Sequence, residues 1–416
     1  MSFSRVSSLG SGLRSIALSS RAAISHGSAA VAGALNDGLD AFEHIIPDRL
    51  PEEATGLDHV AKEVRDYFNG LPEFQYEYMV GVGGYGVALC VRHTTSSERS
   101  RRLIVKRARH EAFADDLRNE IDIMSKLNGS AHIAGVVGYK DDREIENQQP
   151  QRRRLRLLRR LATSLSREPR RHHPQPSSDF LIGLSGPTLV LDYLENGTLD
   201  RLLSKLQQAN KAVPNRVLWS IFLCLIRACA AMNDLSNRPN SNAPELEEIE
   251  ERQGPRVSVH HGDMHLGNIL FGDAGDFPEH AVIPPAKLID FGLAIEHAAA
   301  NPLNVMDAAK NMVWLVLRRL TPIGLNSVIH QEILTLGVML LGNKFLEEYP
   351  TIDLELRDLV VRCLAMRPGD RPLLSDLLRT AKHAVATKGE AFYGPLVPQE
   401  SDATIQSFVQ EHIYDA

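Results

Sequence analysis

Strand-like segments come first in this chain of 416 residues, and segments with helical periodicity come later. Short apolar runs typical of strands cover 77–82, 87–91, 103–106, 132–139 and 187–193. Apolar residues at helical spacing predict helices over 57–68, 111–127, 199–206 and 216–235, and they dominate 307–385. Because most strands precede most helices, the order predicts an α+β fold with a small β-rich lobe and a larger helical lobe.

Composition limits the function classes that fit this chain. Its net charge of −6 argues against whole-molecule attraction to nucleic acid or to an anionic membrane. The four cysteines are scattered without metal-ligand spacing, which favours ordinary packing in a reducing compartment, so a cytoplasmic location is expected. The most apolar run, Val217 to Ile226, is too short to span a bilayer and is expected to be a buried helix.

Changes in composition divide the chain. The predicted parts are a disordered or targeting tail over 1–55, a β-rich lobe with a hinge over 56–194, a helical lobe over 195–390 and a C-terminal tail over 391–416. The first 36 residues contain no Asp or Glu, three arginines and ten serines. A serine-rich disordered tail is the favoured interpretation of this composition, and a mitochondrial transit peptide is the alternative.

Two insertions interrupt the predicted lobes. The first, 141–186, holds nine arginines and one acid within 151–173, and the second, 236–255, holds five glutamates. A solvated loop is the favoured interpretation of the arginine-rich stretch. The alternative is a docking patch for an acidic or phosphorylated partner. Nothing in the sequence places the two insertions close together.

Two short sequence strings contain the residue types that a phosphoryl-transfer site needs. His-Gly-Asp-Met-His-Leu-Gly-Asn occupies 261–268, and Asp290-Phe291-Gly292 begins 22 residues after Asn268. Asp263 and Asn268 allow one loop to present a proton acceptor and a magnesium ligand together. Asp290, beside a glycine that frees the backbone, supplies a second metal contact.

A glycine-rich segment lies between the first two predicted strands, with glycines at Gly81, Gly83, Gly84 and Gly86. Glycines let a backbone turn tightly and bring its N–H groups against phosphate oxygens. The dinucleotide-binding fold would require these glycines to open a helix, but a strand follows them here. A phosphate-covering hairpin is therefore the favoured interpretation, and a plain hairpin turn is the alternative.

A lysine and a glutamate lie at positions where each side chain needs a partner of opposite charge. Lys106 ends an apolar strand, where a buried ammonium needs a partner. Glu120 lies on the same helical stripe as Leu117 and Met124 and so points toward the core. The sequence therefore predicts an ion pair that would aim Lys106 at phosphates. The alternative is two unrelated side chains that reach solvent.

These features occur in the order and approximate spacing of the protein kinase superfamily, which the chain resembles over about 75–382. The segment 189–197 is similar to that family's hinge, and 356–378 resembles its closing helical subdomain. The resemblance implies a bilobal protein kinase-like fold with ATP and Mg²⁺ as cofactors. It further implies that Asp263 is the catalytic base and that Asn268 and Asp290 bind magnesium. Lys106 would bind the phosphates, and Glu120 would position Lys106.

The resemblance also implies where adenine would bind. Leu191 would be the gatekeeper, and hinge backbone groups around Asp192 and Leu194 would hold the adenine ring. Apolar side chains at Ala88, Ile104 and Leu270 would sandwich that ring. His261 and Phe291 match positions that stack in a hydrophobic spine. At Ala88 and Ile104 the small and large residues are exchanged relative to the family's usual Val and Ala, which conserves volume.

Three departures from the family pattern bear on regulation and substrate. Gly262 replaces an arginine that grips a phosphorylated activation segment, and the segment from Asp290 to Asp307 is short and contains no Ser, Thr or Tyr. We therefore expect no control by phosphorylation within that segment. The third departure is His265, which stands where Ser/Thr kinases have a lysine.

Three functions remain open on these residues. The leading hypothesis is a protein kinase that modifies Ser/Thr hydroxyls. His-Gly-Asp followed by His265 is also similar to the aminoglycoside phosphotransferase and choline kinase group, which phosphorylates small-molecule hydroxyls. The third is a non-catalytic pseudokinase that uses its arginine-rich insertion as a binding platform. The phosphoryl acceptor, protein or small molecule, is not identified by the sequence.

Overall fold

A computed structural model describes most of the chain after residue 58. The described residues are 59–82, 86–95, 99–141, 179–235, 244–249, 257–275, 277–298, 352–365 and 370–414. They belong to one compact unit, Leu57–Ala416. The predicted N-terminal tail, the arginine-rich stretch 151–173 and the helices expected over 307–351 lie outside the described residues.

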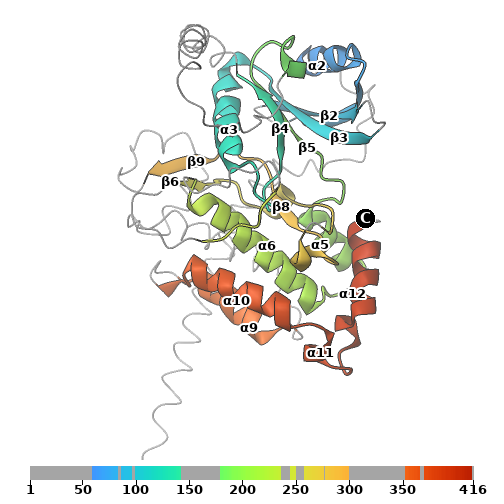
Figure 1. The fold of residues 1–416 in the computed structure, drawn as a ribbon, viewed down its shortest axis with the longest axis vertical. Coiled ribbons are helices and arrows are strands. Elements are labelled where there is room, and N and C mark those ends of the chain that lie inside the picture. The colour runs from blue at the N-terminus through green and yellow to red at the C-terminus, as the bar shows by residue number, and fades with distance from the viewer. Residues whose placement is uncertain are drawn as a thin grey trace, which may run out of the picture. The chain divides into compact units, whose positions relative to one another are not determined.

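An antiparallel sheet of five strands forms the N-terminal part of this unit (Figure 1). Its strands are β1 (Phe74–Val82), β2 (Gly86–Thr94), β3 (Ser100–Ala108), β4 (Val136–Lys140) and β5 (Thr188–Asp192), in the spatial order β1-β2-β3-β5-β4. All five were predicted, but β4 begins four residues later than expected. Residues 132–135 pair elsewhere instead, since Ala134 N donates to Leu288 O at 3.1 Å.

The two faces of the sheet are covered by different helices. Helix α2 (His59–Asn69) packs with one apolar cluster that includes Leu103 and Val105 of β3. Helix α3 (Ala114–Leu127) belongs to the other cluster, against which Ile104 packs. Because side chains alternate along a strand, Lys106 shares the α3 side of β3 with Ile104.

Helices make up most of the rest of the described chain. They are α5 (Leu199–Gln208), α6 (Asn215–Asn233), α9 (Leu354–Cys363), α10 (Leu374–Thr387), α11 (Glu390–Tyr393) and α12 (Asp402–Val409). Helix α6 is long and apolar enough to cross a membrane, but 94% of its most apolar window is buried inside the protein. It packs against α10 (Figure 1), so the prediction of a buried helix is confirmed.

Two short hairpins carry the loops that the sequence analysis singled out. In one, β6 (Val257–His260) pairs with β9 (Ile295–Ala298), and in the other, β7 (Ile269–Phe271) pairs with β8 (Ala286–Leu288). Short helical turns occur at Glu111–Phe113, Asp179–Leu181, Leu266–Asn268, Pro278–His280, Pro398–Glu400 and Gln410–Tyr414. A sheet followed by helices is the mixed α+β class that the sequence predicts.

The C-terminal segment, expected as a tail over 391–416, is folded up to residue 414. Helix α12 and the π-helical turn after it bury Ile405, Val409 and Ile413 almost completely. Tyr414 Oη accepts a hydrogen bond from Ala274 N at 3.2 Å. The apolar spacing of this segment is what anchors it.

Candidate functional site

Lys106 joins three segments that are distant in sequence. From the end of β3, its Nζ donates to Glu120 Oε1 at 2.7 Å and to Asp290 Oδ1 at 2.9 Å. Glu120 comes from α3 and is buried, as its place on the apolar stripe predicts. The predicted ion pair is therefore present, and Asp290 is a second partner that the sequence did not indicate.

The charges in this cluster shift one another. Burial alone would lower the pKa of Lys106, but the charges of Asp290 and Glu120 outweigh burial and hold that pKa above its ordinary value. The charge of Lys106 holds the pKa of Asp290 below its usual range. Burial raises the pKa of Glu120, which shares the ammonium with Asp290.

Exposure distinguishes the two carboxylates. The Asp290 side chain is 45% exposed, whereas the Glu120 side chain is 5% exposed. One ammonium between two carboxylates leaves an excess of negative charge when both are ionised. Asp290 is therefore the carboxylate that can take a further cation from solvent.

Asp290 adopts an unusual backbone conformation. Its φ is 65°, in the left-handed region that residues other than glycine seldom occupy. Neighbouring contacts hold the segment, because Ile289 N donates to Asn268 O at 2.9 Å and Asn119 Nδ2 donates to Ala294 O at 2.8 Å. Strain of this kind persists where the surrounding structure fixes it, which is common at functional sites.

The loop 261–268 is tied to the Asp290 segment through His261. The buried His261 donates from Nε2 to Ile289 O at 3.0 Å, and its Nδ1 accepts from Asp263 N at 3.2 Å. Its ring packs edge-to-face on Phe291 with centroids 4.6 Å apart. Both residues therefore position the loops through buried contacts.

Asp263 and Asn268 lie side by side at the two ends of this loop. Asn268 Nδ2 donates to Asp263 O at 2.9 Å and lies 3.3 Å from Asp263 Oδ2. These contacts occupy the amide nitrogen and leave Asn268 Oδ1 as the oxygen available to a cation. The Asp263 side chain is 40% exposed, so its carboxylate is accessible to an acceptor.

Gly262 makes a close contact that only glycine allows. Its φ is +80°, and a Cβ at this position would lie 2.6 Å from Leu293 O. At this point the backbones of the two loops approach each other closely. This contact gives a physical reason for the absence of an arginine at this position.

His265 lies beside Asp263. Its Nδ1 accepts from Gly267 N at 3.1 Å, and its Nε2 lies 3.7 Å from Asp263 Oδ2. The side chain is more than half exposed. When protonated, His265 would place a positive charge near the Asp263 carboxylate.

Two of the four predicted loop glycines are described. Gly81 lies near the end of β1 and Gly86 at the start of β2, whereas Gly83 and Gly84 lie outside the described residues. A Cβ on Gly86 would lie 2.6 Å from Arg107 O, so the pairing of β2 with β3 requires a glycine there.

The predicted adenine-contacting side chains lie on half-buried positions. Ala88 pairs with Lys106 across β2 and β3, and Ile104 pairs with Leu191 across β3 and β5. Leu270 lies in β7 and forms an isolated bridge with Thr198. Ile104 therefore lies on the same strand as Lys106, and Ala88 lies on the neighbouring strand.

Asp192 and Leu194 lie where β5 ends. Asp192 N donates to Gly135 O at 3.0 Å, and the carboxylate lies 3.4 Å from Arg101 Nη1. Burial raises the pKa of Asp192. A Cβ on Gly135 would clash with Asp192 Oδ2, so this carboxylate packs on the β4 side instead of joining the Lys106 cluster. Leu194 is half-buried.

The side chain of Arg371 is shielded from solvent. Its Nε donates to Ala365 O at 2.8 Å. A backbone carbonyl therefore provides a partner for this guanidinium.

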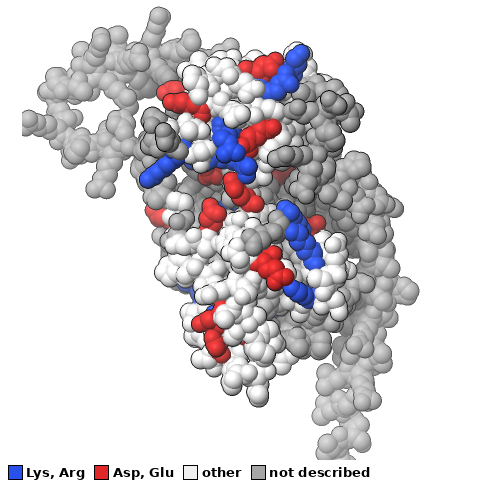
Figure 2. Space-filling model, turned by 90° about the vertical axis from the view of Figure 1, so that its right-hand side faces the viewer, with Lys and Arg blue, Asp and Glu red and all other residues white. Residues whose placement is uncertain are grey.

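Charges are mixed on the face seen in Figure 2. Among the described residues in that view, Lys and Arg side chains alternate with Asp and Glu, without an extended patch of one sign.

Sequence reasoning missed the contacts that join the loops. The side chain of Asn119 joins α3 to the Asp290 segment. The carbonyl groups of Ile289 and Leu293 join that segment to the Asp263 loop. Two of these are backbone carbonyls, which carry no signal in a sequence. Asn119 is the one side chain among these three groups, and its position on α3, directly before Glu120, could have indicated a contact near the site.

Comparison with known proteins adds no assignment: no protein-family model matches the chain, and no curated protein matches it significantly.

Proposed function

We propose that this protein is an ATP- and Mg²⁺-dependent protein kinase with a bilobal kinase-like fold that phosphorylates Ser/Thr hydroxyls. One observation carries the proposal. Lys106 Nζ contacts the carboxylates of both Glu120 and Asp290, and the Asp290 segment is bonded to the loop that presents Asp263 and Asn268. A phosphoryl-transfer site needs this combination of a cation, metal-binding oxygens and a proton acceptor.

The oxygen donors of the site fit magnesium. Asp290 offers a half-exposed carboxylate. Asn268 offers its amide oxygen, because its hydrogen bonds to Asp263 use only the amide nitrogen. Hard oxygen donors of this kind suit Mg²⁺ better than zinc or copper. Bound Mg²⁺ would neutralise charge on the phosphates of ATP.

The remaining residues have distinct roles in this proposal. Lys106, held by Glu120, would bind the α- and β-phosphates and neutralise their charge. The Asp263 carboxylate would orient the acceptor hydroxyl and take its proton, and Asn268 would hold that carboxylate in place. The glycines around Gly81 and Gly86 would let the backbone approach the phosphates.

Regulation would differ from that of kinases with a phosphorylated activation segment. The contact between Gly262 and Leu293 O supports the absence of an arginine clamp. Residues 299–307 of the segment lie outside the described residues, and the whole segment lacks a hydroxyl side chain. A phosphate detected by mass spectrometry between residues 290 and 307 of the active protein would contradict this part of the proposal.

A second candidate function is favoured by a specific observation. The glycine contact at Gly262 and the approach of His265 to Asp263 belong to the part of the chain that is similar to the aminoglycoside and choline kinase group. On that assignment the same five residues would act on a small-molecule hydroxyl.

Transfer of radiolabelled γ-phosphate tests the proposal. The protein would be incubated with Mg²⁺, labelled ATP and a cell extract, which is then separated into protein and metabolite pools. We expect label in the protein pool, lost with Asp263→Asn and kept with Asp358→Asn, a substitution at an exposed position of α9. Label in the metabolite pool alone would favour the second candidate, and label that survives Asp263→Asn or never appears would contradict both.

A further inference from the structure

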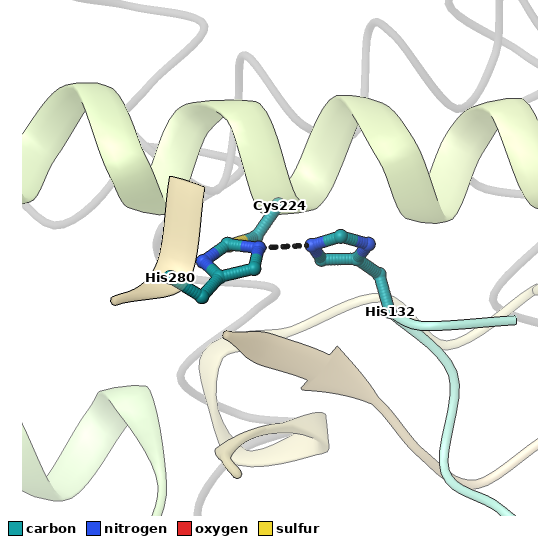
Figure 3. A group of neighbouring side chains, drawn as sticks. All are labelled: His132, Cys224 and His280. Atoms are coloured by element: carbon teal, nitrogen blue, oxygen red, sulfur yellow. Dashed lines mark hydrogen bonds between the residues drawn. The ribbon is translucent and has the colours of Figure 1, made fainter. Parts of the chain in front are cut away.

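Three side chains that commonly bind metals meet inside the helical part of the protein. His132 precedes β4, Cys224 lies on α6 and His280 ends the short turn Pro278–His280. One ligand atom from each lies within 4.8 Å of the others, and all three residues are fully buried. Figure 3 shows the two imidazole rings facing each other below α6, with Cys224 reaching toward them from that helix.

The orientation of His132 is fixed by a carboxylate. His132 Nδ1 donates to Glu247 Oε2 at 2.6 Å, and the backbone N of His132 donates to Glu247 Oε1 at 2.8 Å. With the proton on Nδ1, the lone pair of His132 is on Nε2, which lies 2.9 Å from His280 Nε2. A carboxylate behind one ring nitrogen is the usual support of a metal-binding histidine.

The charge around the cluster also favours a cation. Glu247 and Glu279 are largely buried, and the buried guanidinium of Arg227 lies 2.7 Å from Glu279 Oε1. Two carboxylates and one guanidinium leave one negative charge. A divalent cation bound to a Cys224 thiolate would add one positive charge in total and make the buried group neutral.

We propose that His132, Cys224 and His280 bind a zinc ion. A thiolate with two imidazoles is a typical zinc ligand set, and it disfavours Mg²⁺ and Ca²⁺. Glu279 Oε1, 3.4 Å from His280 Nε2, is at hand as a fourth ligand. Tetrahedral zinc would hold two imidazole nitrogens about 3.3 Å apart, which requires only a slight widening of the 2.9 Å contact.

The site would be structural and independent of the proposed phosphoryl transfer. It would join three segments: the loop after α3, the core helix α6 and the turn that follows β7. Because His132, Cys224 and His280 are buried, a closed four-ligand site is expected. Removing the metal should therefore lower thermal stability.

Elemental analysis of the full-length protein, purified under reducing conditions with added zinc, tests the proposal. We expect about one zinc per chain, and at least a tenfold lower content in Cys224→Ala and His280→Gln. Cys229→Ala, a matched control at another buried cysteine of α6, should keep its zinc. Glu247→Gln should weaken zinc binding by about 10- to 100-fold through loss of the supporting carboxylate.

A measurement on the unaltered protein covers the case in which the ligand variants do not fold. X-ray absorption of the zinc-loaded protein should show one sulfur and at least two imidazoles around the metal, and a chelator should lower the melting temperature. Absence of zinc after supplementation, a metal without a sulfur ligand, or equal zinc loss in Cys229→Ala would each overturn the proposal.

Discussion

At the scale of the residue, the ammonium of Lys106 holds the candidate site together. It contacts a buried carboxylate on α3 and a half-exposed carboxylate after β8. The buried partner, Glu120, is almost completely shielded from solvent and depends on Lys106 to stabilise its charge. The exposed partner, Asp290, is left able to bind a cation. The difference between the two carboxylates gives Lys106 separate roles in stability and in nucleotide binding.

Replacing Lys106 separates these two roles. We expect Lys106→Ala to raise the ATP concentration needed for phosphoryl transfer and to lower the free energy of unfolding by about 1–3 kcal/mol, because Glu120 loses its partner. The double variant Lys106→Ala/Glu120→Gln should recover part of the stability but not the ATP affinity. Urea denaturation and ATP titration measure the two effects. Lys62→Ala on the exposed side of α2 is the control, and an equal effect there would contradict the assignment.

Gly262 offers a test of the contact between the two loops. Gly262→Ala combines left-handed backbone strain with the 2.6 Å approach to Leu293 O. Gly394→Ala has similar strain, with φ +74°, but open space around the new Cβ. We expect about 1 kcal/mol of destabilisation for Gly394→Ala, from strain alone, and clearly more for Gly262→Ala. Equal losses in chemical denaturation would show that the close contact does not matter.

At the scale of the element, alternation and helical spacing predicted the strands and helices well. The five strands of the sheet and helices α3, α5 and α6 lie close to their predicted positions. The start of β4 was wrong because residues 132–135 have a strand-like composition but bond to β8 and to Glu247 instead. These long-range partners have no signature in a local pattern, so the boundary was not predictable.

The start of α9 is stabilised by a charge that responds to pH. Asp353 caps this helix and accepts a hydrogen bond from Lys388 Nζ at 2.7 Å. Burial alone would raise the pKa of Asp353, but the hydrogen bond and charge of Lys388, together with the other donors around the carboxylate, outweigh burial and hold that pKa below its ordinary value. A group whose pKa is lower in the folded state stabilises the protein above its ordinary pKa, and this stabilisation is lost as the pH falls.

Asp353→Asn therefore changes the acid side of the stability profile. Asparagine also caps helices well, so the substitution removes the charge and keeps the cap. Relative to wild type, we expect a loss of about 1–2 kcal/mol at pH 7, which shrinks as the pH falls below about 4. Thermal unfolding from pH 3 to 7 measures it. Asp376→Asn, at a half-exposed position in the first turn of α10, should show little change, and a loss that is constant with pH in Asp353→Asn would contradict the account.

At the scale of the whole molecule, contacts between distant segments decided what the sequence could not. The pairing of Lys106 with Glu120 was predictable, because each residue interrupts an apolar pattern and needs a partner. The cluster of His132, Cys224 and His280 was not, since the three residues are far apart in sequence and lack metal-ligand spacing. Glu247 is one of the five glutamates of the second insertion, yet it is buried against His132.

The folded C-terminal segment is a further example of such a contact. Glu400 is buried, and its carboxylate accepts from Asn215 N at 2.6 Å and from Arg216 N at 3.1 Å, at the start of α6. A carboxylate here satisfies free N–H groups and interacts favourably with the helix dipole.

Glu400→Gln should therefore weaken the attachment of this segment to α6. We expect a loss of about 1–2 kcal/mol in the free energy of unfolding and faster proteolysis of residues after 388. Urea denaturation and limited proteolysis provide the measurements. Gln399→Ala, at the exposed position beside Glu400, should behave like wild type. Unchanged stability in Glu400→Gln would show that apolar packing alone holds the segment.

The most direct test of the proposed nucleotide site is a crystal structure with Mg²⁺ and a non-hydrolysable ATP analogue. We predict Mg²⁺ bound to Asn268 Oδ1 and the Asp290 carboxylate, Lys106 Nζ on the α- and β-phosphates, and the terminal phosphate facing Asp263. A nucleotide bound away from Lys106, or crystals that stay free of nucleotide at saturating concentration, would contradict the account.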